Sequence, residues 1–398
     1  MQVLFLHNNF PAQFGRLGEF LISNGVDVWF GTQRKNSAAP GVKVFNYAPH
    51  RQPDRKTHPY VRSFESASIN GQAVARAAIE QQKRGLAPDI VVAHSGWGPG
   101  LYVKEVWPKA RYIGYFEWYY HANSPDILHF KNENQSLDEH LCRQGRNAAI
   151  LADLVNCDAG VCPTRFQWEQ LPDIFRSKVQ IIHDGVDTET YKRKPDARRP
   201  IENLVLKGDE QFITYVARGM EPYRGFPEFM KALELIQRAR PNVHAIIVGE
   251  DRVAYGKKLK DDDSFKKRAL SELDLDLGRT HFTGLVPRNR YREILQASNV
   301  HAYLTIPFVL SWSMMEAMSA ECAIVASDTA PVREMIDDDA HGVLADMTKP
   351  EAVADAITGL LDDEDKCRRL GRAARDRIVF NYDSRDLHQK LWRLIAKG

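Results

Sequence analysis

Several features that mark particular classes of protein are scarce or missing in this chain of 398 residues. It has only five cysteines, none with Cys-x-x-Cys spacing, which favours reduced thiols and gives no sign of a zinc site. No run of about 18 apolar residues occurs, so the sequence predicts no transmembrane helix. A formal net charge of +2 does not mark the chain as a whole for nucleic acid or an anionic membrane.

Targeting and metal-binding signals are scarce as well. The first residues, MQVLFLHNNF, contain neither a basic leader nor a small-residue cleavage site, and we interpret them as a buried strand of a cytoplasmic protein. The acidic runs Asp261–Asp263 and Asp337–Asp339 superficially resemble a D-x-D metal motif. Both lie in turn-like sequence away from a strand end, so we expect solvated helix caps and no obligatory metal or other cofactor.

What the chain does contain is a regular alternation of short apolar runs with helix-length amphipathic segments. This alternation predicts parallel sheets covered by helices, an α/β fold. Eleven predicted strands are too many for one comfortable sheet. The predicted strands are QVLFLH, DVWFGT, VKVFNY, DIVVAH, RYIGYFE and AGVCPT in the first half, and FITYVAR, HAIIVGE, HFTGLV, HAYLTI and AIVASD in the second.

A polar, charge-rich stretch at residues 188–210 separates the two sets of strands and is interpreted as the interdomain region. We predict two doubly wound, Rossmann-like domains facing each other across a cleft, the first at residues 1–182 and the second at 183–383. In such sheets ligands bind beyond the C-terminal strand ends. The last segment, 384–398, has apolar residues at Leu387, Leu391, Leu394 and Ile395, a spacing typical of a packed helical face. We expect it to pack back on the first domain.

The segment from His301 to Ile336 carries the most information about function. It predicts a buried strand, a turn and a helix that begins near Ser311, a plausible N-cap. Free backbone N–H groups and the helix dipole at such a start favour an anion. Glu316 lies one and a half turns further on, where it could meet the hydroxyls of a phosphate-bearing ligand. An ordinary crossover with an exposed Glu has the same pattern.

Two arginines follow a strand predicted to end at Ala217. Arg218 and Arg224 flank a Gly-containing turn before a helix, and Arg suits bidentate phosphate contacts. They form either a clamp for a diphosphate or a pair of solvated loop arginines. Gly249 ends the companion strand and would allow a ligand close to the backbone. Gly284 lies in a turn that could receive a nucleobase, although a plain turn looks the same.

The first half offers weaker candidates for an acceptor side. His94 follows a predicted strand and precedes a Gly-rich turn, so it either lines the cleft or makes structural hydrogen bonds. The segment HRQPDRKTHPYVRSF contains His58 and Arg62 among other basic residues. It could bind an acceptor or dock on a membrane, but a solvated basic loop is the more common outcome.

Five segments of the second half occur in the order of five known motifs. HDGVDTETY is similar to N-G-V-D-x-x-x-F, RGMEPYRG to G-R-x-x-x-x-K-G, IIVGED to I-V-G-x-G, HFTGLVP to F-x-G-x-V, and MMEAMSAECAIVASDTAPVREMI to L-E-A-M-A-x-G-x-P-V-V-A-x-x-x-x-G-x-x-E. These are motifs of glycosyltransferase family 4, the group 1 retaining enzymes with the two-domain GT-B fold. The resemblance covers roughly Ile181 to Asp383.

The resemblance implies a role for each matched residue. Arg218 and Arg224 would hold the donor diphosphate, and Glu316 would bond the ribose hydroxyls. The backbone amides around Leu310 and Ser311 would take the distal phosphate. In the first half, Gly15 would lie where the family's glycine loop approaches the donor.

The chain also departs from the family pattern. Phe308 stands eight positions before Glu316, where the family usually has a Glu that contacts the transferred sugar, although a bacterial subgroup resembles this variant. The spacing from Arg218 to Arg224 is one residue longer than usual. In the first half the family's His is replaced by Glu117, with His121 four residues later. Either of these would orient the sugar or the acceptor.

The resemblance implies retaining, metal-independent transfer from a nucleotide-diphosphate sugar, such as a UDP or GDP sugar. The acceptor would be a glycan (as in polysaccharide biosynthesis), a lipid-linked compound or a small molecule. One hypothesis is that the protein contacts the inner face of the membrane. The alternatives are a sugar-nucleotide epimerase of the same fold and a non-catalytic nucleotide-sugar-binding protein. A partner-binding scaffold would leave the arginines without a role.

Overall fold

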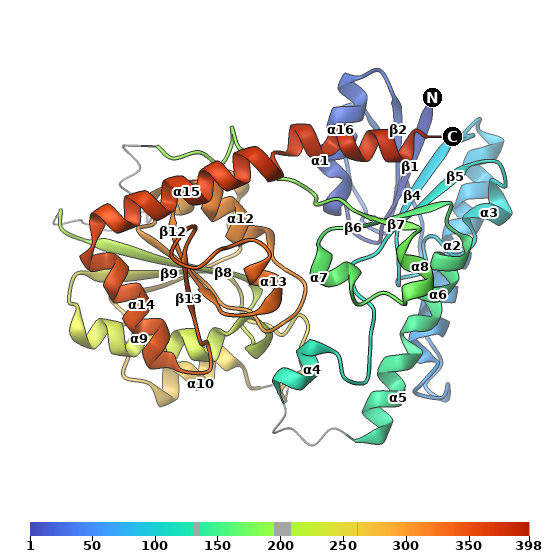
Figure 1. The fold of residues 1–398 in the computed structure, drawn as a ribbon. Coiled ribbons are helices and arrows are strands. Elements are labelled where there is room, and N and C mark those ends of the chain that lie inside the picture. The colour runs from blue at the N-terminus through green and yellow to red at the C-terminus, as the bar shows by residue number, and fades with distance from the viewer. Residues whose placement is uncertain (131–135, 195–207, 261, 398) are drawn as a thin grey trace. The chain divides into compact units, whose positions relative to one another are not determined.

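The computed structural model describes residues 1–130, 136–194, 208–260 and 262–397. The chain forms two compact units, each built around one parallel sheet (Figure 1). The first unit comprises Met1–Gly185 together with the C-terminal residues from Ser384 onward, and the second comprises Val186–Asp383. The boundary lies before the polar stretch 188–210. The part of that stretch at 195–207 lies outside the described residues, and Thr188 to Lys194 belong to the second unit.

The first unit contains a seven-stranded sheet in the order β3-β2-β1-β4-β5-β6-β7. All its neighbouring strands run parallel, and its central strands are buried on both faces, as a sheet covered by helices requires. The strands are β1 (Gln2–Leu6), β2 (Asp27–Thr32), β3 (Val42–Asn46), β4 (Ile90–His94), β5 (Arg111–Tyr115), β6 (Ala159–Cys162) and β7 (Val179–Ile181).

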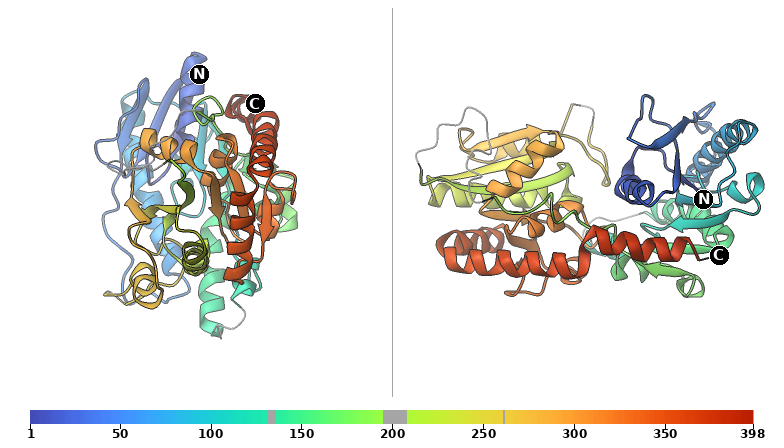
Figure 2. Two further views of the ribbon diagram at one scale, coloured as in Figure 1. Left: turned by 90° about the vertical axis from the view of Figure 1, so that its left-hand side faces the viewer. Right: turned by 90° about the horizontal axis from the view of Figure 1, so that it is seen from above.

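Helices pack on the first sheet and on one another (Figures 1 and 2). The C-terminal helix α16 packs on α1, where the rings of Phe20 and His388 lie 5.8 Å apart, and Leu394 and Ile395 are buried. The amphipathic spacing therefore predicted its packed face. The helices are α1 (Gly15–Ser23), α2 (Arg62–Lys83), α3 (Val103–Val106), α4 (Pro125–His129), α5 (Leu137–Gly145), α6 (Asn147–Asn156), α7 (Arg165–Trp168), α8 (Asp173–Arg176) and α16 (Ser384–Ile395).

The second unit contains a six-stranded parallel sheet in the order β10-β9-β8-β11-β12-β13. The order reverses between β8 and β11, which is the topological switch point where ligands of such sheets bind. The strands are β8 (Gln211–Gly219), β9 (Val243–Glu250), β10 (Thr280–Gly284), β11 (Val300–Tyr303), β12 (Ala323–Ser327) and β13 (Val343–Ala345).

Two layers of helices cover the second sheet. Helices α9 and α14 pack together on one face, and α11, α12 and α15 pack on the other around a core that includes Met314, Ile324 and Ile378. The elements are α9 (Phe226–Ala239), α10 (Phe265–Glu272), α11 (Arg288–Ala297), α12 (Trp312–Ser319), α13 (Ala330–Arg333), α14 (Pro350–Asp362) and α15 (Glu364–Tyr382), with the short 3-10 helices η1 (Ala12–Phe14) and η2 (Pro222–Arg224) in the first and second units.

The structure confirms all eleven predicted strands and the helix start at Ser311, which is the N-cap of α12. It adds β7 and β13, each of three residues, which are too short to show an alternating pattern. One boundary was wrong. Strand β8 continues past Ala217 to Gly219, because its pairing with β9 resumes after a register shift between Val216 and Gly219. Arg218, predicted to follow the strand, therefore lies within its irregular end.

Candidate functional site

The centre of the candidate site in the second unit is Arg224, at the end of η2. Its side chain is only 4% exposed, so it is not a solvated loop arginine. Its Nη1 donates to Thr305 Oγ1 at 2.9 Å, to the Val309 carbonyl at 2.8 Å and to the Tyr303 hydroxyl at 3.5 Å. The guanidinium also lies 5.0 Å from the ring centroid of Tyr255. Every one of these partners is neutral.

A buried guanidinium whose hydrogen-bond partners are all neutral favours the binding of an anion. Arginine stays protonated in proteins, and burying an unpaired charge costs several kcal/mol. Among the residues that the structure describes, no carboxylate forms an ion pair with Arg224, although the charge of the buried Glu221 acts on it from nearby. Nη1 makes its hydrogen bonds to Tyr303, Thr305 and Val309. The rest of the guanidinium edge is the part that suits bidentate phosphate recognition. The local structure therefore fits an anion-binding group held in place before the ligand arrives.

Arg218, the other predicted clamp residue, differs from Arg224. Its side chain is exposed near the C-terminal end of β8, at the register shift between β8 and β9. Irregularities of this kind redirect side chains and are common beside functional sites. The structure thus gives one buried, oriented arginine and one exposed arginine, a difference that the sequence did not reveal.

The start of α12 lies next to the same cluster. Tyr303, at the end of β11, accepts a bond from Nη1 of Arg224 and another from the Ser311 backbone N–H, at 2.7 Å. The Ser311 amide, predicted to face a phosphate, is therefore bonded to Tyr303. The Ser311 side chain accepts from the Ser313 N–H at 3.4 Å, and the neighbouring Leu310 is half-buried.

Glu316 is half-buried on α12 and has a partner that sequence reasoning missed. The hydroxyl of Tyr291, on α11, donates to Glu316 Oε2 at 2.9 Å. Burial, with the Glu316 charge beside it, raises the pKa of Tyr291 well above its usual value, so this hydroxyl stays a donor. The bond fixes the direction of the carboxylate.

Phe308 is 7% exposed and belongs to an aromatic group. Its ring lies edge-on to Tyr223 and to Tyr255, with centroids 5.3 Å away in both cases. These distances are typical of favourable aromatic pairs. The turn at Phe308 is therefore apolar, and it packs against the ring that lies over Arg224.

The three predicted donor-side glycines have different surroundings. A Cβ on Gly249 would lie 1.9 Å from the Ala217 carbonyl oxygen, so this glycine is needed for the approach of β9 to β8. A Cβ on Gly284 would meet nothing within 4 Å, and its φ of +66° explains glycine there. A Cβ on Gly15 would lie 2.9 Å from Pro11 Cγ, so Gly15 permits the tight turn into α1.

In the first unit, the C-terminal strand ends bring His94 and Glu117 together. His94 Nε2 lies 3.6 Å from Glu117 Oε2, and His94 Nδ1 lies 2.9 Å from the Ser95 carbonyl oxygen. The His94 ring, 3% exposed, also packs edge-on to His7 at 4.9 Å. His7 follows β1 and was not predicted as a site residue. Glu117 is partly exposed, so the pair presents a carboxylate supported by a buried imidazole.

His121 does not join this pair. It is exposed, and its Nε2 lies 2.6 Å from the Gln170 carbonyl oxygen. His58 and Arg62 are also exposed and are tied within their own loop. His58 stacks edge-on with Tyr60 at 4.4 Å, and Arg62 donates to the carbonyl of Thr57 at 3.2 Å. The structure therefore groups only His94 with Glu117 among these predicted residues.

Asp153 is a buried acid that bonds Ser95, the residue after His94. Asp153, on α6, accepts from Ser95 Oγ and from the Tyr112 hydroxyl, each at 2.8 Å. Burial raises the pKa of Asp153 to about 6, against these hydrogen bonds, which lower it. Ser95 directly follows His94, so Asp153 holds the backbone that carries the histidine.

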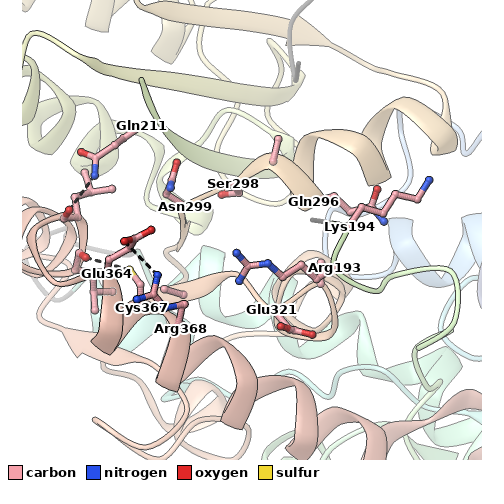
Figure 3. A pocket seen from close by; sticks show the side chains of 15 residues that line it. Arg193, Lys194, Gln211, Gln296, Ser298, Asn299, Glu321, Glu364, Cys367 and Arg368 are labelled. Atoms are coloured by element: carbon pink, nitrogen blue, oxygen red, sulfur yellow. Dashed lines mark hydrogen bonds and ion pairs between the residues drawn. The ribbon is translucent and has the colours of Figure 1, made fainter. Parts of the chain in front are cut away.

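A different hollow lies at the opposite edge of the second sheet, where its strands begin (Figure 3). Gln211, Asn299 and Ala323 line it at the starts of β8, β11 and β12. Charged side chains surround it, and Arg368 pairs there with Glu364 at 3.1 Å. Ligands of parallel sheets bind at the other edge, so this hollow is not the candidate donor site.

The acidic runs form ion pairs where they are described. Asp263 bonds Arg268, Asp337 bonds Arg377 and Asp339 bonds Lys366, while Asp261 lies outside the described residues. Within the part of the chain that the structure describes, no group of three or more His, Cys, Asp or Glu side chains has a metal-binding arrangement. The same part contains no helix with the length and apolar character needed to cross a bilayer.

Comparison with known families identifies the chain. Residues 24–191 match the glycosyl transferase family 4 group, and residues 197–377 match the glycosyl transferases group 1. The two matches together span most of the sequence. The chain belongs to the family 4, group 1 glycosyltransferases.

Similar proteins of known name or structure agree with this glycosyltransferase assignment. D-inositol 3-phosphate glycosyltransferase of Nocardia farcinica is 25% identical over 229 residues, 56% of this chain and 49% of that protein. Sucrose-phosphate synthase from Thermosynechococcus elongatus has a TM-score of 0.75 at 16% identity, covering 99% of this chain and 98% of its own. Anabaena HepE, solved with UDP and glucose, has a TM-score of 0.73 at 15% identity and full coverage of both chains. These solved structures establish the GT-B fold. The matches to curated relatives span between 26% and 55% of the relatives' own length.

The pKa of Asp153 leads to a testable pH dependence. Because the folded state raises this pKa from an ordinary value near 3.8 to about 6, it binds the proton more tightly than the unfolded state. Stability contributed by this group is therefore lost as the pH rises from about 4 through 6, by about 3 kcal/mol. Asp153→Asn stays neutral at every pH. Its melting temperature relative to wild type should rise between pH 4.5 and 7.5.

Asp158→Asn is a control, because the pKa of Asp158 shifts in the opposite direction. Burial pushes the pKa of Asp158 up, but the Lys104 ammonium and the Tyr112 amide pull it further down, below its usual value. Asp158 therefore stabilises the fold above its ordinary pKa of 3.8, and this contribution is lost only as the pH falls below that value. The melting-temperature difference between its Asn variant and wild type should therefore stay nearly constant between pH 4.5 and 7.5. A melting-temperature difference for Asp153→Asn that stays constant with pH would contradict the assignment.

Proposed function

We propose that this glycosyltransferase moves a sugar, with retention of configuration, from a nucleotide-diphosphate sugar to an acceptor. The observation that carries the proposal is the buried Arg224, whose protein partners are all neutral. It lies at the end of η2, beyond the C-terminal end of β8 and next to the switch point between β8 and β11. A diphosphate is an anion that matches a rigid guanidinium edge. The complex of HepE with UDP and glucose supports the choice of a nucleotide.

The proposed chemistry is electrostatic stabilisation of the leaving group. Negative charge grows on the diphosphate as the sugar departs, and Arg224 is already oriented to receive it. Groups preorganised in this way contribute about 3–4 kcal/mol each to transition-state stabilisation. Arg218 and the start of α12 would add to the positive potential. The leaving phosphate itself would accept the acceptor's proton on the same face, so the step requires neither a metal nor a dedicated base.

Glu316 and Glu117 have different proposed roles. Glu316, oriented by Tyr291, would accept bonds from two ribose hydroxyls of the nucleotide. Glu117, supported by His94, would orient the transferred sugar or the acceptor. His121 is given no role in this proposal, because its ring bonds a backbone carbonyl. The acceptor class is a hydroxyl compound, and the name of the Nocardia relative supports a phosphorylated polyol as one example.

Removing the arginines tests the proposed nucleotide site. Arg218→Ala with Arg224→Ala should weaken binding of UDP or GDP by about 2–4 kcal/mol, because charge-assisted bonds to the diphosphate are lost. Isothermal titration calorimetry would measure this affinity, and turnover that persists in excess chelator would support metal independence. Arg238→Ala, which removes an exposed arginine of α9, should leave the affinity unchanged. Equal affinities of the double variant and wild type, with both folded, would contradict the clamp.

A donor panel separates the two ends of the nucleotide sugar. Glu316→Gln should lower nucleotide affinity by on the order of 1–3 kcal/mol, because a charged acceptor is lost. Phe308→Glu should alter sugar preference or lower turnover while nucleotide binding survives, because it changes the apolar turn beside Arg224. Binding and turnover would be measured separately with UDP, GDP, ADP and TDP sugars.

The products of the same panel discriminate between the alternative activities. An epimerase would convert the sugar nucleotide without an acceptor, and a non-catalytic binding protein would bind donors without turnover. Transfer to an added hydroxyl acceptor supports the proposal. Unchanged ribose-dependent affinity and unchanged turnover in Glu316→Gln would show that α12 has been matched wrongly to the family.

We further propose that the first unit contacts an anionic membrane through the loop before α2 and through α5. Arg55 and Lys56 are exposed in the loop, beside the exposed apolar side chain of Val61. The Tyr60 hydroxyl bonds Asp138, which ties the loop to α5, where Leu137 is 72% exposed. Basic side chains beside exposed apolar ones are typical of peripheral membrane surfaces.

Vesicle sedimentation tests the membrane proposal. Arg55→Glu with Lys56→Glu should reduce binding to vesicles that contain phosphatidylserine, because each basic residue near such a surface contributes about 1 kcal/mol. Lys83→Glu with Arg84→Glu reverses the same charge at the other end of α2 and should have little effect. Equal loss in both variants, or no binding by wild type, would overturn the proposed surface.

A further inference from the structure

Glu221 is a fully buried carboxylate that sequence analysis did not single out. It lies between β8 and η2, and its side chain is 0% exposed. Three consecutive backbone N–H groups donate to it. Those of Ala254 and Tyr255 bond Oε1 at 2.9 and 3.1 Å, and those of Tyr255 and Gly256 bond Oε2 at 3.0 and 2.7 Å. The carboxylate therefore has backbone donors on both oxygens, which satisfies a buried charge without a cation.

The three amides belong to the loop that follows β9, here called the 254–256 loop. A second contact brings the segment that follows β9 close to the end of β8. A Cβ on Gly219, beside Glu221, would lie 2.5 Å from the Arg252 carbonyl oxygen and 3.2 Å from the Ala254 nitrogen. Gly219 leaves room for the segment that follows β9, and Glu221 bonds it. Together they hold this segment against the end of β8, where Arg218 lies.

The middle residue of the loop reaches the proposed diphosphate site. The Tyr255 ring centroid lies 5.0 Å from the Arg224 guanidinium carbon and 5.3 Å from the Phe308 ring. A cation over an aromatic face gains more when it is desolvated, and Arg224 is 4% exposed. The backbone of Tyr255 is bonded to Glu221, and its ring covers Arg224. One carboxylate thus determines where the ring lies.

We propose that Glu221 is a positioning residue for diphosphate binding, which acts through the 254–256 loop and Tyr255 on Arg224. This inference rests on the proposed function. Without the carboxylate, the three amides lose their acceptor, the loop leaves its place and Arg224 becomes free to turn away from the anion site. Glu221 itself touches neither the nucleotide nor the sugar.

The geometry requires a carboxylate at this position and not an amide. In Glu221→Gln one oxygen becomes an NH2 group, which cannot accept the bonds that Oε1 or Oε2 now accepts. The new NH2 group then faces a backbone N–H of the 254–256 loop, and both donors stay buried without an acceptor. Such unsatisfied donors destabilise a protein interior. The substitution keeps the shape of the side chain, so its effect reports on hydrogen bonding and charge.

The test joins hydrogen exchange to ligand binding. In Glu221→Gln, amide exchange at residues 254–256 should accelerate at least tenfold, measured by mass spectrometry without ligand. Affinity for UDP or GDP should fall by about tenfold to a hundredfold. Affinity for uridine or guanosine, which lack the diphosphate, should change by less than threefold. A general loss of folding would weaken all these ligands together, whereas a positioning role weakens only the diphosphates.

Glu250→Gln is the matched control. Glu250 ends β9, pairs at the surface with Arg252 at 2.7 Å and carries the same charge as Glu221. It should leave exchange of the 254–256 loop and diphosphate affinity as in wild type. An equal loss of affinity in Glu250→Gln would attribute the effect to net charge and overturn the proposal.

Tyr255→Leu provides a second test of the same proposal if Glu221→Gln folds poorly. Tyr255 is 37% exposed, so the fold tolerates a smaller apolar side chain there. This variant should lower diphosphate affinity about tenfold with nucleoside affinity retained, because Arg224 loses its aromatic cover. Unchanged diphosphate affinity in either variant overturns the positioning role. If wild type binds no nucleoside diphosphate, the proposed function is wrong and the role of Glu221 in ligand binding fails with it, whereas the exchange data still report whether Glu221 holds the loop.

Discussion

The interaction on which the candidate site depends is the hydrogen bonding of a buried guanidinium to neutral oxygens. Arg224 bonds Thr305 and the Val309 carbonyl, and a tyrosine ring lies against it. A carboxylate partner would have neutralised the cation and removed its attraction for a ligand. Neutral partners fix its direction and leave its charge available. Burying this cation costs folding energy in the free protein, and an anion bound there would offset that cost.

The surrounding residues are arranged so that this cation can stay in place. Tyr303 bonds both the guanidinium and the Ser311 amide, so it links the arginine to the start of α12. The Glu221 carboxylate accepts its hydrogen bonds from backbone amides and forms no direct ion pair with Arg224. Two opposite charges therefore lie buried in one small region, each held by its own neutral partners. A direct ion pair between them would have been simpler, but it would have left no binding site.

The first unit uses a similar principle with weaker charges. Asp153 is a buried acid below the strand end that carries His94, and it is satisfied by two hydroxyl donors. His94 in turn lies beside Glu117, which is partly exposed. In both units, a buried carboxylate with several hydrogen bonds holds in place the segment next to a group that has a role in the proposed chemistry.

The sequence by itself determined the alternation of strands and helices, the parallel sheets and the start of α12, because hydrophobic period and capping are local properties. It also located Arg224 and Glu316 through motif order. Tertiary structure alone decided that Arg224 is buried while Arg218 is exposed, that Glu117 pairs with His94 and not His121, and that Gly249 serves strand packing. It also revealed Glu221, whose amide partners lie more than thirty positions away in sequence. Burial and hydrogen-bond partners depend on residues from different elements brought together by folding, and no local pattern records them.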